Sequence, residues 1–144
     1  MKLGIKKIQC IPSALCADWS YYPAGSVIDI QPFVNGEFLE LEGTQNTLAY
    51  KESWSDDENG CKSSISISGS IRRSSISGKQ QLGALLGKGQ IVLIFSVEGP
   101  VLVVGSKEMP SKITFEESYE GLSLKELPFL ISCESTHGAL ILSE

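Results

Sequence analysis

The sequence predicts a mostly β fold, an antiparallel β-sandwich or a partly open barrel with one short α-helix. Three turn signals lie between runs of strand-forming residues: Asn35-Gly36, Asp57-Glu58-Asn59-Gly60 and Glu98-Gly99-Pro100. Asn-Gly and other glycine-containing turns tolerate the positive φ that tight hairpins require. The 144 residues, 42% of them hydrophobic, are enough for one domain with its own core. We expect a single β-rich domain over 1–144.

The first part of this domain, 1–46, is expected to hold a strand, an aromatic loop and a hairpin. Apolar residues alternate loosely over 3–11 and stop at Pro12, which lacks the backbone donor of a central strand. This pattern predicts a strand with a slip or bulge. Residues 27–34 and 37–41 are expected to pair around Asn35-Gly36, with Pro32 restricting the incoming strand to an edge or a bulge.

The second part, 47–144, is expected to form a hairpin-helix-hairpin core. Residues 47–55 and 61–71 predict a hairpin in which Ile65 and Ile67 face the core and serines face water. Residues 77–86 are good helix formers that predict one short helix. The apolar run 91–97 is typical of a buried central strand. It is expected to pair with 101–104, and further strands are expected at 113–117, 129–134 and 139–142.

Charge and hydropathy argue against two classes of partner. The net charge of −5 opposes attraction to nucleic acid, because such binding depends on neutralising phosphates with Lys and Arg. The longest apolar run is far shorter than the roughly 20 residues that cross a bilayer, so no membrane span is expected. Lys6, Lys7 and Gln9 interrupt the continuous apolar run that a secretory signal requires, so we read the start of the chain as mature sequence made in the bacterial cytoplasm.

Candidate chemistry is sparse, and we predict no catalytic, cofactor-binding or metal-binding residue. His137 is the only histidine, and no G-x-S-x-G motif accompanies it, so a turn or interface role is favoured over catalysis. The acidic turn at 56–60 lacks calcium-loop spacing and is interpreted as a solvated hairpin tip. The glycines of 83–89 follow the predicted helix, whereas those of a phosphate loop precede one.

The four cysteines have no paired ligand spacing, so we expect reduced thiols and no zinc site. Four aromatic residues are the candidates for a contact surface, since aromatic side chains anchor protein interfaces. Burial in the core is an equally good interpretation for each of them: Trp19, Tyr21, Tyr22 and Trp54.

Several short segments follow one another in a recognisable order. They are Glu52-Ser53-Trp54-Ser55, the acidic turn, the serine-rich strand, the L-x-x-L-x-G-K phrase ending at Lys88, Ile91-Val92-Leu93-Ile94-Phe95, Val103-Val104-Gly105-Ser106 and His137-Gly138-Ala139-Leu140. In this order the stretch 47–142 resembles small structural proteins from prophages of Bacteroides-type bacteria. The resemblance covers about two thirds of the chain. It implies a non-catalytic tail or virion component whose partners are itself or other virion proteins, and therefore a homo-oligomer located in the virion.

Two alternatives come from other classes. One is a binding module of β-barrel type for a small ligand or a carbohydrate, with Trp54 and the tyrosines around a concave polar site. The other is a hydrolase, which requires a Ser or Cys within hydrogen-bond reach of His137 and a carboxylate that orients the imidazole.

Overall fold

The computed structural model describes residues 5–19, 21–23, 25–41, 48–58, 60–72, 87–96, 99–115 and 126–143. Its strands form two sheets. The six-stranded sheet has the order β2-β10-β7-β6-β1-β3 and comprises β1 (Ile5–Pro12), β2 (Val27–Ile28), β3 (Leu39–Leu41), β6 (Gln90–Ser96), β7 (Leu102–Val104) and β10 (Leu140–Leu142). The four-stranded sheet has the order β4-β5-β9-β8 and comprises β4 (Ala49–Asp57), β5 (Gly60–Arg72), β8 (Lys112–Phe115) and β9 (Glu126–Ser135).

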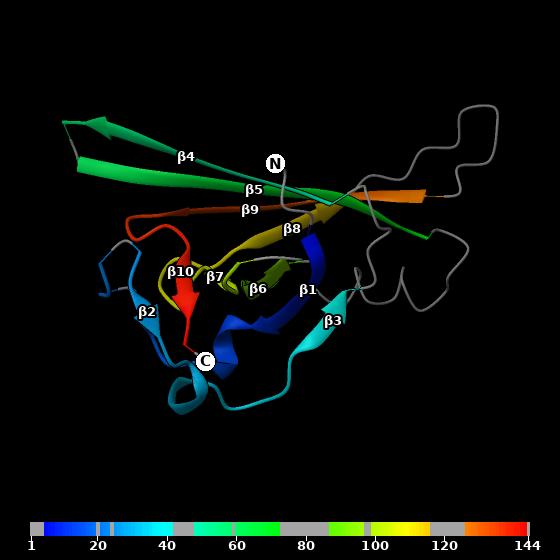
Figure 1. The fold of residues 1–144 in the computed structure, drawn as a ribbon, viewed down its shortest axis with the longest axis horizontal. Helices are drawn as coiled ribbons and strands as arrows, with labels where there is room; N and C mark the ends of the chain where they lie inside the picture. The colour runs from blue at the N-terminus through cyan, green and yellow to red at the C-terminus, as the bar shows by residue number, and fades with distance from the viewer. Residues whose placement is uncertain are drawn as a thin grey trace.

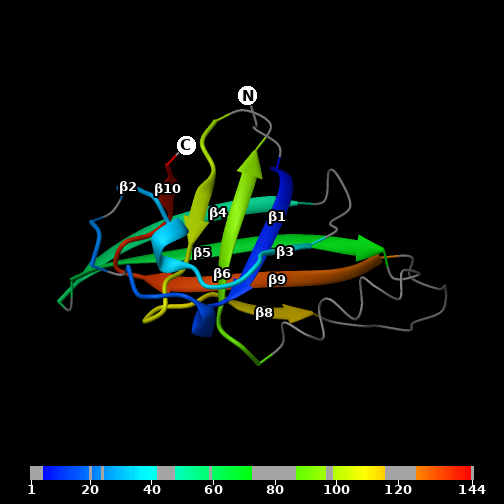
Figure 2. The ribbon, with the colours of Figure 1, turned by 90° about the horizontal axis from the view of Figure 1, so that it is seen from below.

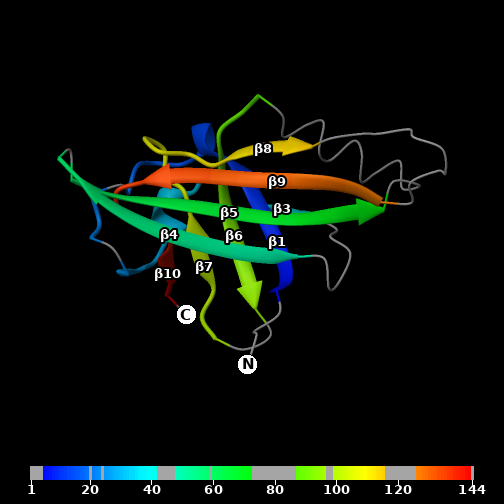
Figure 3. The same cartoon turned by 90° about the horizontal axis from the view of Figure 1, so that it is seen from above.

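The two sheets stack face to face, and the predicted sandwich is confirmed (Figure 1). All pairings are antiparallel except that of β10 with β2. Strands β1 and β6 run across the direction of β5 and β9, as Figures 2 and 3 show from opposite sides. Crossed packing of this kind leaves strand ends of each sheet projecting beyond the other.

The main core lies between the sheets. Alternation along β5 turns Ile65 and Ile67 inward, while Ser64 and Ser68 are exposed on the outer face, as the sequence predicts. The inward side chains of both sheets form one cluster: Ile8, Cys10, Ile65, Ile67, Val92, Ile94, Val104, Ile113, Phe129, Ile131 and Cys133.

A second cluster covers the other face of the six-stranded sheet. It combines residues of that sheet with buried side chains of the loops at 13–38: Ile11, Cys16, Trp19, Ile28, Ile30, Ile91, Leu93, Val103 and Leu140. Strand β6 therefore has Val92 and Ile94 in one cluster and Ile91 and Leu93 in the other. Burial on both faces explains its continuous apolar run, and the predicted central strand is confirmed.

The prediction of a hairpin around Asn35-Gly36 is wrong. Strand β2 pairs with β10 and β3 pairs with β1, so the segments before and after the turn lie in different parts of the sheet. Pro32 instead lies in a 3-10 turn, Gln31–Phe33, which needs no ladder donor at that position. The backbone N–H of Ala17 donates to Phe33 O (2.7 Å), which aligns this segment with the chain around residue 16.

Gly36 lies near Leu15, since a Cβ at this position would be 2.9 Å from Leu15 Cδ1. The other two hairpins are confirmed, β4 with β5 and β6 with β7, as is the irregular first strand, whose register with β6 shifts between Ile5 and Lys7. The strands expected near the end correspond to β8, β9 and β10.

The helix predicted at 77–86 lies outside the described residues. In the described part of the chain no helix is long and apolar enough to cross a membrane.

Candidate functional site: the β4 edge and the cluster behind it

Strand β4 forms one edge of the four-stranded sheet, because it pairs with β5 on one side and with no described strand on the other. Its residues Lys51, Ser53, Trp54, Ser55 and Asp56 are all exposed. Nine residues are a long edge for a small protein, since natural sheets usually shorten, bulge or cover their edges.

The register of the β4–β5 hairpin decides which backbone groups of β4 are free. Asp57 lies opposite Gly60 across a two-residue loop. In a hairpin closed by a two-residue loop, the two residues that flank the loop form a hydrogen-bonded pair, in which each N–H donates to the C=O of the other residue. Hydrogen-bonded and non-bonded pairs alternate along a ladder, so Ser53 and Ser55 bond to β5. Tyr50, Glu52, Trp54 and Asp56 therefore direct their backbone N–H and C=O groups away from the sheet.

Trp54 projects from the inner face of the sheet near the hairpin tip and is 47% exposed. Its ring lies against Gly138, where an added Cβ would be 2.6 Å from Trp54 Cζ2. Gly138 has a φ of 65°, which favours glycine, and its N–H donates to Ser135 Oγ (2.9 Å). The turn between β9 and β10 thus lies against the six-membered ring of the indole.

The Glu52 carboxylate accepts hydrogen bonds from three segments of the chain near Trp54. Its Oε2 accepts a hydrogen bond from the Tyr50 hydroxyl (2.9 Å), and its Oε1 accepts from Ser63 Oγ (3.0 Å) and from the backbone N–H of Ala139 (3.3 Å). Burial raises the pKa of Tyr50, and the hydrogen bond to Glu52 and its negative charge raise it further. The carboxylate thus joins β4, β5 and the segment leading into β10.

His137 lies beside this cluster in the turn after β9 and is 1% exposed. Its Nδ1 is 2.6 Å from Gly138 O, and its Nε2 has no hydrogen-bond partner among the described residues. The nearby Ser135 hydroxyl accepts the Gly138 N–H. The side chains that a hydrolase requires are therefore close in sequence, but no Ser or Cys of the described chain is hydrogen-bonded to the imidazole.

The other predicted contact residues divide between core and surface. Trp19 is fully buried, its indole N–H donates to Gly105 O (3.0 Å), and its ring meets Phe33 edge to face at 5.9 Å. Trp19 therefore packs in the core, which is one of the two interpretations that the sequence allowed for it. Tyr21 is 69% exposed and stacks on the partly buried Tyr22 with ring centroids 4.8 Å apart.

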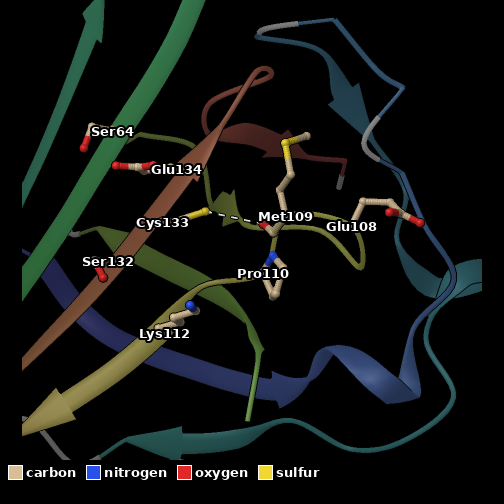
Figure 4. A pocket seen from close by; sticks show the side chains of 8 residues that line it. All are labelled: Ser64, Glu108, Met109, Pro110, Lys112, Ser132, Cys133 and Glu134. Carbon is tan, nitrogen blue, oxygen red and sulfur yellow. Dashed lines mark hydrogen bonds between the residues drawn. The ribbon is translucent and has the colours of Figure 1, made fainter. Parts of the chain in front are cut away.

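A cleft of about 410 Å³ with a mixed polar and apolar lining lies toward the β8 edge of the same sheet (Figure 4). It separates β9 from the loop that precedes β8, and its lining is Ser64, Glu108, Met109, Pro110, Lys112, Ser132, Cys133 and Glu134. The Cys133 thiol donates to Met109 O (3.5 Å). Burial raises the pKa of Cys133, so its thiol stays protonated and is a poor nucleophile.

All four cysteines are free thiols, and only Cys61 is exposed. Among the described residues no three His, Cys, Asp or Glu side chains are grouped as metal ligands would be.

Sequence reasoning missed Glu52 and the free edge. A signal for Glu52 is present, because it lies between Tyr50 and Trp54 at an inward position of the strand. A carboxylate there must be hydrogen-bonded, since burying a charge without partners is costly. The edge of β4 has no comparable signal in the sequence.

No protein-family model, curated protein or solved structure matches this chain.

Proposed function

We propose that this chain is a non-catalytic structural or assembly protein that associates with itself, as a phage-derived tail or virion component would. The observation that carries the proposal is the long exposed edge of β4. A free edge is a template for adding another strand, because its backbone groups are already aligned in a ladder. Self-association satisfies these groups and covers apolar surface on Trp54.

The exposed aromatic residues fit the same function. Trp54 and Tyr21 are the two most exposed aromatic side chains among the large hydrophobic residues of the described chain. Trp and Tyr are enriched at the energetic centres of interfaces, where they exclude water and add contact area. Trp54 is held against Gly138, so ordering it on association costs little side-chain entropy.

The experiment is the solution mass of the purified protein by light scattering, over a wide concentration range and at two salt concentrations. Self-association predicts a defined oligomer, or a mass that grows with concentration. A strict monomer under all conditions overturns the self-associating function.

A second candidate, a small-ligand or carbohydrate-binding module, is supported by the cleft beside β9, although neither Trp54 nor a tyrosine lines it, contrary to the expectation from the sequence. Its carboxylates, its hydroxyls and Lys112 can donate to and accept from sugar hydroxyl groups. Calorimetric titration with a panel of mono- and oligosaccharides tests this function. Binding that is lost in Glu134→Ala and retained in Trp54→Ala supports it, and no heat from any sugar rejects it.

A further inference from the structure

We propose that two copies pair through β4, antiparallel and related by a twofold axis through Ser53, so that their four-stranded sheets join into one continuous sheet. The inference rests on the self-association proposed above and identifies its contact. Most oligomers of identical chains have closed symmetry, and a twofold axis perpendicular to a sheet lets the same edge serve both copies.

The first argument is backbone geometry. Within the described residues, the N–H and C=O groups of β4 that point away from β5 have no strand partner, and they belong to Tyr50, Glu52, Trp54 and Asp56. A twofold axis through Ser53 brings Glu52 of one copy opposite Trp54 of the other, and Tyr50 opposite Asp56. Each of these is a hydrogen-bonded pair of an antiparallel ladder, so every free group of the edge gains a partner. Ser53 then lies opposite its own copy as a non-bonded pair.

The second argument is charge, which selects this register from its neighbours. The axis must pass through a residue, because paired positions must lie on the same face of the joined sheet. An axis through Lys51 or Glu52 puts two identical charges opposite each other. An axis through Trp54 puts Glu52 opposite Asp56. Like charges directly opposite are destabilising.

Only an axis through Ser53 pairs the whole of β4, from Ala49 to Asp57, and leaves no like charges directly opposite. It also brings the acidic end of the strand in one copy beside Lys51 of the other.

The third argument is the environment of Trp54. In this register the indole, 47% exposed in one chain, lies across from Glu52 of the second copy. That carboxylate is already bonded to three donors of its own chain. It therefore adds no unpaired charge to the covered surface, and the hydrocarbon part of its side chain packs against the ring.

Cross-linking tests both the contact and its register. The background is Cys61→Ser, which removes the only exposed thiol, and two variants are compared, Ser53→Cys and Ser55→Cys. Non-bonded antiparallel pairs have Cα atoms about 4.5 Å apart, within the roughly 4.4–6.8 Å of disulfides. The two copies of position 55 are four residues out of register, or about 13 Å apart.

With oxidised glutathione as oxidant, Ser53→Cys should form a covalent dimer at least tenfold faster than Ser55→Cys. Both positions are exposed serines on the same strand, so they are matched in accessibility. Equal rates, or faster dimerisation of Ser55→Cys, overturn the register.

A proline substitution tests the backbone bonds separately. Asp56→Pro removes an N–H that points to the free edge, whereas Ser55→Pro removes one that bonds to β5, so only the second should destabilise the folded chain. Asp56→Pro is expected to weaken dimerisation at least tenfold in analytical ultracentrifugation, with the melting temperature of the dilute protein unchanged. If Asp56→Pro leaves the dimer intact, the contact lies elsewhere and the self-associating function survives. A wild-type protein that is always monomeric overturns both.

Discussion

The carboxylate of Glu52 on β4 accepts a hydrogen bond from the backbone N–H of Ala139, 87 residues further along the chain. Oε1 also accepts from Ser63, and Oε2 accepts from Tyr50. One partly buried side chain thereby connects the edge of the four-stranded sheet to the start of β10 in the six-stranded sheet.

Glu52→Ala should lower the free energy of unfolding by about 2–3 kcal/mol, because hydrogen bonds to a charged group contribute about 1.5–3 kcal/mol and three donors lose their acceptor. The control is Glu134→Ala, an exposed carboxylate on the outer face of the same sheet, for which a change within about 0.5 kcal/mol is expected. Urea unfolding followed by far-UV circular dichroism measures both. Equal small effects would mean that Glu52 does not connect the sheets.

Trp19→Phe should destabilise the monomer by about 1–2 kcal/mol. The smaller ring loses contacts in the second cluster, and Gly105 O loses its buried donor. Tyr21→Ala is the comparison, since Tyr21 is largely exposed and its loss should change monomer stability by about 0.5 kcal/mol or less. Thermal unfolding of both variants at low concentration checks the expectation, and a larger loss for Tyr21→Ala would contradict it.

Cys61 should be the only thiol that reacts quickly with a disulfide reagent at pH 8 in the native protein. Burial raises the pKa of Cys10 to about 12, and burial also raises the pKa of Cys16, although the charge of Lys107 lowers it in part. Thiolates are the reactive form, so these buried thiols stay protonated as well as covered. The fast phase should disappear in Cys61→Ser, and a fast phase that persists there would show a second accessible thiol.

The stability of the protein should fall at alkaline pH partly because of Tyr50. Its pKa is raised in the folded state, first by burial and then by Glu52, whereas an unfolded tyrosine ionises near pH 10. Above that pH the unfolded chain loses a proton that the folded chain retains, so stability is present below about pH 10 and falls as pH rises.

The matched variant is Tyr50→Phe, which keeps the ring and removes the ionisable hydroxyl. Wild type should be the more stable protein at pH 8, and its advantage should shrink by up to about 1.4 kcal/mol per pH unit above pH 10. Urea unfolding of both proteins from pH 8 to 11.5 measures this difference, in which the other tyrosines and cysteines cancel. Parallel curves would show that Tyr50 ionises equally easily in both states.

The strands that sequence could predict are those whose pattern is local. Alternation around Ile65 and Ile67 and the turn before Gly60 specify the β4–β5 hairpin without reference to the rest of the chain. The same kind of local evidence failed at Asn35-Gly36. There, backbone hydrogen bonds join Phe33 and Asn35 to Ala17 and Leu15, and these partners are distant in sequence.

The candidate site was predictable only in part for the same reason. Trp54 could be selected as an aromatic residue, but its exposure was not predicted, and its contact with Gly138 and the bonds of its neighbour Glu52 depend on the turn between β9 and β10, more than 80 residues away. Trp19 has the same composition signal and the opposite environment. Residue type alone does not distinguish a tryptophan that is exposed at the surface from one that is buried in the core.

The parallel pairing of β2 with β10 has a consequence for how the chain is made. Ribosomes deliver β2 early, yet the strand beside it comes from residues 140–142, so β2 must wait while more than a hundred further residues are synthesised. Strand β1 likewise waits for β6, its neighbour at the centre of the sheet. The six-stranded sheet therefore cannot close until residues 140–142 have left the ribosome, and until then apolar segments such as the one around Trp19 lack the strands that cover them.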